Sequence, residues 1–123
     1  IDTYPVVGDP RFALSVTYGA LGQNDDATLP SDFILHPVYP NPFNPSTLIR
    51  YQLPQEARVT INIYDMMGRT VRTLVRSETQ IAGYRQVMWN ATNDLGQPVS
   101  AGMYLYVIQA GEFKDTRKMV LMK

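Results

Sequence analysis

Apolar residues in this 123-residue chain alternate with polar ones, and no window of ten or more residues places them at helical spacing. The alternation is clearest in Arg11–Tyr18, where one face carries only Phe12, Leu14, Val16 and Tyr18. Nine prolines and eight glycines interrupt the apolar segments along the whole chain. This pattern predicts an all-β protein built from short strands.

Six further strands are predicted after the first, at the spacing typical of a β-sandwich. They cover Thr47–Leu53, Arg58–Tyr64, Thr70–Val75, Tyr84–Asn90, Met103–Gln109 and Phe113–Met122. Ala110, Gly111 and Glu112 are expected to join the last two in a tight hairpin. We therefore predict an antiparallel sandwich of about seven strands.

Changes in composition along the sequence divide the chain into three parts. Residues 1–18 form a predicted β-strand arm, residues 19–36 a polar linker, and residues 37–123 the sandwich. The sandwich opens on Tyr39–Pro45, where three prolines disfavour helix. This segment could serve as a polyproline ligand, but we expect a structural role in which Asn41 and Asn44 cap turns.

Charge and composition exclude several classes of partner. Lys plus Arg equals Asp plus Glu at 11 each, which disfavours a nucleic-acid or anionic-membrane partner. The longest apolar run, Met103–Ile108, is about a third of the length of a membrane-spanning helix, so no transmembrane segment is expected. The chain starts with Ile1, which suggests that it has been processed or cut and that any export signal has already gone.

No group of residues has the pattern of a catalytic or metal site. The chain has no cysteine and one histidine, His36, so a metal would need carboxylate and carbonyl ligands. Oxygen-bearing residues cluster only at Asp25–Asp26 and at Asn90–Asp94, neither with the spacing of a calcium loop. We expect no enzyme activity, no cofactor, no metal and no small-molecule substrate.

Two groups of apolar residues could pair with one another. The segment Met103–Ile108 is apolar on both faces, so one face needs a cover. The N-terminal strand could supply that cover, in cis or from a neighbouring copy. The donor residues would be Phe12, Leu14, Val16 and Tyr18, and the acceptor or core residues Trp89, Tyr104, Tyr106 and Ile108.

Several motifs occur in order from residue 37 to the end. They are YPNPFNPSTLIRYQLP from Tyr39, VTINIYDMMGRTVRTLV from Val59, and AGYRQVMWNATNDLGQPVSAGMYLYVIQAGEFKDTRKMVLMK from Ala82. This series resembles the type A C-terminal sorting domain of the bacterial type IX secretion system, a family related in fold to the immunoglobulin-like domain of the flagellar hook-capping protein. One departure is Asn90, where the family commonly has Asp.

The resemblance implies an immunoglobulin-like sandwich at the C-terminus of exported proteins. In that family the domain acts as an export address at the outer surface of a Gram-negative-type bacterium, and is often cleaved and replaced by a surface anchor. It also implies that the last strand carries the recognition signal, at Arg117, Lys118, Met119, Val120 and Leu121. The same charged residues could instead protect an edge strand from aggregation.

Two functions follow from these patterns. If the 123 residues are a whole subunit, they predict a non-enzymatic extracellular or cell-surface structural protein that pairs strands into a homo-oligomer, filament or tube. The alternative is the sorting or anchoring domain of a larger exported protein, with the secretion machinery as its partner. The first is our leading hypothesis from the residues.

Overall fold

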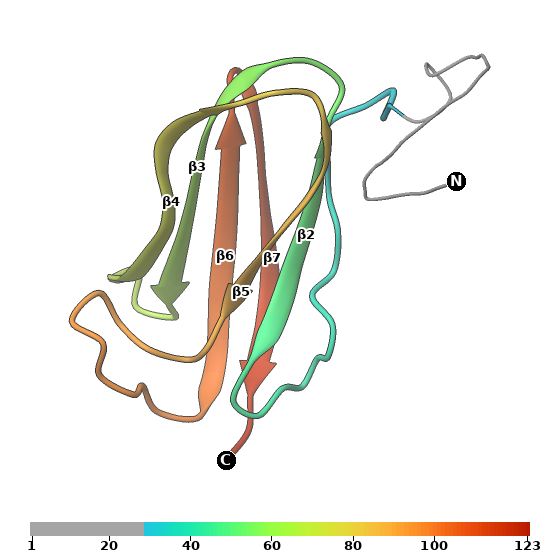
Figure 1. The fold of residues 1–123 in the computed structure, drawn as a ribbon. Coiled ribbons are helices and arrows are strands. Elements are labelled where there is room, and N and C mark those ends of the chain that lie inside the picture. The colour runs from blue at the N-terminus through green and yellow to red at the C-terminus, as the bar shows by residue number, and fades with distance from the viewer. Residues whose placement is uncertain (1–28) are drawn as a thin grey trace. The chain divides into compact units, whose positions relative to one another are not determined.

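Seven strands in two antiparallel sheets make up the part of the chain that the computed structural model describes, residues 29–123. One sheet has the order β1-β2-β5, and the other has the order β4-β3-β6-β7 (Figure 1). The strands are β1 (Ile34–Leu35), β2 (Thr47–Leu53), β3 (Ala57–Asp65), β4 (Thr70–Gln80), β5 (Gly83–Trp89), β6 (Gly102–Ala110) and β7 (Phe113–Leu121). Residues 29–123 contain no helix, and the predicted all-β sandwich is confirmed.

Alternating side chains place one face of each central strand in the core. In β2 the buried residues are Thr47, Ile49, Tyr51 and Leu53, as the period of two predicts. In β3 the inward set is likewise Val59, Ile61 and Ile63. Two apolar stripes therefore face each other across the sandwich, which is how a small two-layer domain excludes water from its core.

Trp89 lies at the centre of an aromatic cluster. Its ring is fully buried, 5.7 Å from the ring of Phe43 and 5.3 Å from that of Tyr104 in an edge-to-face arrangement. Its indole Nε1 donates a hydrogen bond to the backbone oxygen of Thr92 at 2.8 Å. The cluster joins the last residue of β5 to β6 of the other sheet, so it holds the two layers together.

Two elements differ from the sequence-based expectations. Ile34–Leu35, inside the predicted linker, form β1 and pair with Gln52 and Tyr51 of β2. Strand β4 continues to Gln80, five residues beyond the predicted end at Val75. It does so across a bulge in which Ser77 has φ 49°, and the amide of Ser77 donates to the hydroxyl of Thr60. The polar sequence after Val75 has no apolar alternation to mark it as strand.

The predicted turns form through side-chain acceptors. Asp65 closes the turn between β3 and β4 by accepting from the amides of Met67 and Arg69, at 2.9 and 3.0 Å. The bond from the Arg69 amide is the main reason that the pKa of Asp65 lies below its usual value. The last two strands meet in a hairpin around Gly111, whose φ of 61° suits glycine.

Buried phenols make the stability of the fold sensitive to alkaline pH. Burial is the main cause that raises the pKa of Tyr51 and of Tyr106 above the ordinary value of about 10. The unfolded chain therefore loses these protons at lower pH than the folded chain does. We expect the free energy of unfolding to hold up to about pH 9 and then to fall, by about 1.4 kcal/mol per pH unit for each tyrosine still protonated when folded.

Denaturant titrations between about pH 8 and 11 measure this slope. The variant Tyr106→Phe should show a shallower fall. Equal slopes in the wild-type and Tyr106→Phe proteins would contradict the prediction.

Candidate functional site

Strand β7, which contains the predicted recognition residues, lies at the edge of the four-stranded sheet. It pairs with β6 along its whole length, from Phe113 opposite Ala110 to Leu121 opposite Gly102. Its other edge faces away from the sheet. An edge strand can present both side chains and main-chain groups to a partner, which a central strand cannot.

The five predicted recognition residues divide between the core and the surface. Met119 and Leu121 are fully buried, and Val120 is half-buried. Arg117 and Lys118 are exposed. The strand is thus anchored by alternate apolar residues, and a basic pair remains accessible to a partner.

The segment of residues 33–43, here called the flanking segment, runs beside the outer edge of β7. At its start, the ring of Phe33 stacks on that of Phe113 with 5.4 Å between centroids. Further along, Arg117 Nε donates to the backbone oxygen of Leu35 at 2.7 Å. Because β1 belongs to the three-stranded sheet, these contacts connect the two sheets along one side of the sandwich.

Main-chain bonds join the end of the flanking segment to the end of β7. The amide of Phe43 donates to the Val120 oxygen at 3.0 Å, and the amide of Met122 donates to the Phe43 oxygen at 2.8 Å, which makes a parallel bridge. The outward amide of Val120 donates to Asn41 Oδ1 at 3.0 Å. The last residues of β7 therefore have hydrogen-bond partners on both sides.

The proline-rich sequence explains this pairing. Prolines on both sides of Phe43 restrict the backbone, and the Phe43 side chain is buried against Trp89. The hydroxyl of Thr47 donates to the oxygen of Pro40 at 2.7 Å. The expected structural role of this segment agrees with these contacts, although Asn41 bonds to the last strand instead of capping a turn within its own segment.

A groove of about 360 Å³ lies where the flanking segment meets β7. It is lined by Pro37, Leu105, Tyr106, Thr116, Arg117 and Lys118. The Tyr106 hydroxyl donates to the oxygen of His36 at 2.9 Å, so the polar end of the Tyr106 side chain already has a partner within the domain. Among the residues that the structure describes, neither Arg117 nor Lys118 has a carboxylate at salt-bridge distance. The groove thus has an apolar floor and two basic residues at its rim, of which Arg117 bonds to the Leu35 oxygen.

The predicted donor and acceptor residues are not brought together by the described part of the chain. Phe12, Leu14, Val16 and Tyr18 lie outside the described residues. Trp89, Tyr104, Tyr106 and Ile108 are buried in the core. Tyr104, Tyr106 and Ile108 of β6 face the three-stranded sheet of the same sandwich, and Trp89 of that sheet packs on Tyr104. These four side chains therefore do not need a strand from elsewhere.

The oxygen-bearing loop after β5 forms hydrogen bonds within the domain. Asn93 Oδ1 accepts from the amides of Leu95 and Gln97, and Asp94 Oδ1 accepts from the amide of Thr73. Three or more potential metal ligands are nowhere grouped together in residues 29–123. These contacts agree with a structural role for the loop.

Sequence reasoning did not find the pairing of Asn41 and Phe43 with the end of β7. The Asn41 contact joins residues 79 positions apart, and the Phe43 contacts are made by main-chain atoms, which are the same in almost every residue type. The only available signal was an asparagine and a phenylalanine between prolines that restrict the backbone.

We compared the chain with protein-family models, with curated proteins and with solved structures. The family model described as a secretion system C-terminal sorting domain matches residues 37–122. No curated protein matches the sequence. No helix in residues 29–123 is long and apolar enough to cross a membrane.

Two solved structures from Porphyromonas gingivalis have a similar fold. PorZ, an essential bacterial surface component of the type IX secretion system, aligns over 72% of this chain with a TM-score of 0.51 and 22% identity. Dimeric latent PorU aligns over 74% with a TM-score of 0.54 and 24% identity. The chain spans 11% of PorZ and 9% of PorU. At this identity the likeness shows the fold alone.

The hypothesis of a self-assembling filament subunit is wrong. The match to a sorting-domain model over residues 37–122 supports the alternative function instead. The physical error was to treat the two apolar faces of Met103–Ile108 as a surface that needs a foreign strand. Tyr104, Tyr106 and Ile108 form the core face of β6, and the other face is only partly exposed at Leu105 and Val107. No comparison supports a homo-oligomer or polymer.

The bond from Val120 to Asn41 can be tested by hydrogen exchange. Replacing Asn41 with alanine removes the acceptor of an outward-facing amide, so we expect exchange at Val120 to speed up by about tenfold, with a loss of about 1 kcal/mol in stability. The amide of Tyr106, in the centre of the sheet, should change only by the global loss. Unchanged exchange at Val120 would show that Asn41 does not hold the end of β7.

Proposed function

The chain belongs to the secretion system C-terminal sorting domain family, and from this we propose that residues 37–123 act as the export address of the protein that carries them. The observation that carries the proposal is the family match over residues 37–122. The partner would be the type IX secretion machinery, and the destination the cell surface or extracellular space of a Gram-negative-type bacterium. We further propose that the domain has no catalytic activity of its own.

The outer end of β7 is the surface that best suits recognition. Exposed Arg117 and Lys118 lie beside the groove, while Met119 and Leu121 fix the strand in the core. Arg117 is partly engaged by the oxygen of Leu35, whereas Lys118 has no ion pair within residues 29–123 and can meet an acidic partner. We propose that Lys118 makes the main polar contact with the machinery.

Burial in this strand decides how the signal should be tested. Deleting Lys118–Lys123 would remove Met119 and Leu121 from the core as well as the exposed charge. Loss of export after such a deletion would therefore report on folding and on recognition together. Substitution of exposed residues separates the two.

We expect Lys118→Glu to reduce export of the carrying protein by at least about tenfold, because the charge at the contact is reversed. The matched control is Lys114→Glu, the same change on the same strand at another exposed position. Immunoblots of culture medium and cell fractions measure export, and thermal unfolding confirms that both variants fold. Normal export of a folded Lys118→Glu protein would contradict the proposed role of this residue.

A further inference from the structure

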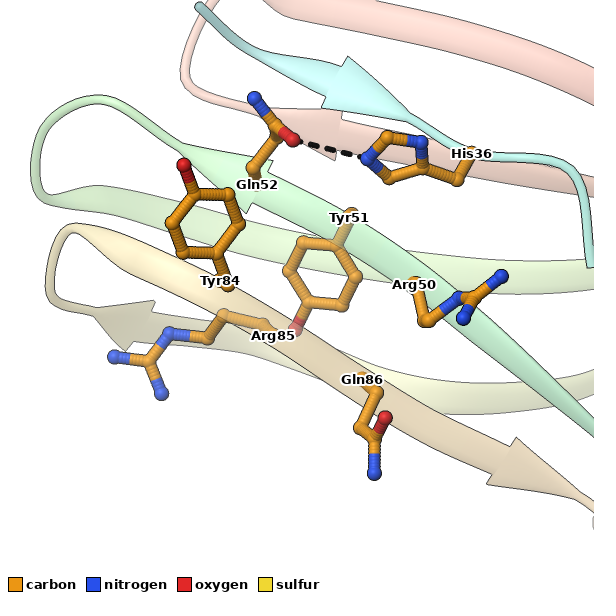
Figure 2. A pocket seen from close by; sticks show the side chains of 7 residues that line it. All are labelled: His36, Arg50, Tyr51, Gln52, Tyr84, Arg85 and Gln86. Atoms are coloured by element: carbon orange, nitrogen blue, oxygen red, sulfur yellow. Dashed lines mark hydrogen bonds between the residues drawn. The ribbon is translucent and has the colours of Figure 1, made fainter. Parts of the chain in front are cut away.

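The outer face of the three-stranded sheet carries a second groove, on the opposite layer from β7. Its volume is about 490 Å³. Figure 2 shows the seven residues that line it: His36, Arg50, Tyr51, Gln52, Tyr84, Arg85 and Gln86. The proposed export function uses none of these residues.

The groove is rich in hydrogen-bond donors and contains no acidic residue. Two arginines, a histidine and two glutamines line it, without an Asp or Glu. Arg50 is exposed, and the one ion pair in residues 29–123 is that of Asp65 with Arg69, elsewhere in the fold. Of the 11 Lys and Arg residues in the chain, all but Arg11 lie in residues 29–123, which gives 10 cations. Of the 11 Asp and Glu residues, four lie before residue 29, which leaves 7 anions. Both the groove and its domain favour an anionic ligand.

Strand register places Arg50 and the exposed Tyr84 on the same face of the sheet. Arg50 lies opposite Gln86, and Gln52 lies opposite Tyr84, so Arg50 and Tyr84 are diagonal neighbours on β2 and β5. Such neighbours are separated by about 7–8 Å. The Tyr84 side chain is 65% exposed on this face. A six-membered sugar ring stacked on Tyr84 could therefore direct a carboxylate substituent to the guanidinium of Arg50.

The remaining polar groups are arranged around this pair. His36 Nε2 and Gln52 Oε1 are 2.9 Å apart, which orients the Gln52 amide and leaves its nitrogen available to donate (Figure 2). Gln86 projects from β5 next to Arg50. Planar amides and a guanidinium beside one ring offer the directional bonds that sugar hydroxyls and carboxylates accept.

We propose that this groove binds a short acidic oligosaccharide, with Tyr84 stacking on a sugar ring and Arg50 holding a carboxylate. A second copy of the chain is a poor occupant, because a two-fold interface would bring Arg50 towards its own symmetry mate. A protein partner is disfavoured because the centre of a protein interface is apolar, whereas Tyr84 is the one exposed ring among the lining residues.

The test is a titration of the 123-residue chain, followed by backbone NMR shifts. The probes are trigalacturonate, the neutral trisaccharide maltotriose and a hexaglutamate peptide. We expect trigalacturonate to shift the amides around Arg50, Tyr84 and Gln86 with a dissociation constant in the range of about 0.1–1 mM, and to weaken as salt is added. The other two probes should bind at least about tenfold more weakly.

Matched variants assign the contacts. Arg50→Gln and Tyr84→Thr should each weaken trigalacturonate binding by about tenfold. The control Arg76→Gln makes the same charge change at an exposed position on β4 and should leave the affinity within about twofold. The proposal is overturned if trigalacturonate does not bind by 10 mM, if maltotriose binds equally well, if only hexaglutamate binds, or if Arg50→Gln and Arg76→Gln behave alike. Export does not enter this measurement, so its result is independent of the proposed sorting function.

Discussion

The packing of Phe43 against Trp89 is the contact on which the rest of the arrangement depends. The ring of Phe43 is buried in the aromatic cluster, and its backbone bonds to Val120 and Met122 at the end of the chain. One residue therefore joins the core to the last strand. Without it, the end of β7 would lose the main-chain partners on its outer edge and keep only those on β6. The flanking segment would remain attached to the four-stranded sheet at Phe33 and Leu35.

The strands that sequence reasoning predicted are those with a buried face. Alternation in β2 and β3 follows from one side of each strand facing the core, so Ile49 and Ile61 could be placed from the sequence alone. The short strand β1 and the polar end of β4 depend on main-chain hydrogen bonds, and the contact of Asn41 with Val120 joins a side-chain oxygen to a main-chain amide. Main-chain bonds leave no periodic trace in the sequence, which is why these elements were missed.

The site was only partly predictable for a related reason. The motifs up to Leu121 indicated the family, and the match over residues 37–122 shows it. The type A assignment and the relation to the flagellar hook-capping protein stay predictions. The sequence did not show which of the last residues are buried, and that division leaves Lys118 accessible while Met119 is not. It also could not show that the core face of β6 is covered by the other sheet of the same sandwich, and this led to the filament hypothesis.

The most direct test of the account is the location of a reporter enzyme that stays in the periplasm of a bacterium with a type IX secretion system. The chain is fused to the C-terminus of this reporter, and activity is measured in the medium, on intact cells and in the periplasm. If residues 37–123 are an export address, the fused reporter is found outside the outer membrane and the unfused reporter is not. Retention of a folded fusion protein in the periplasm would contradict the account.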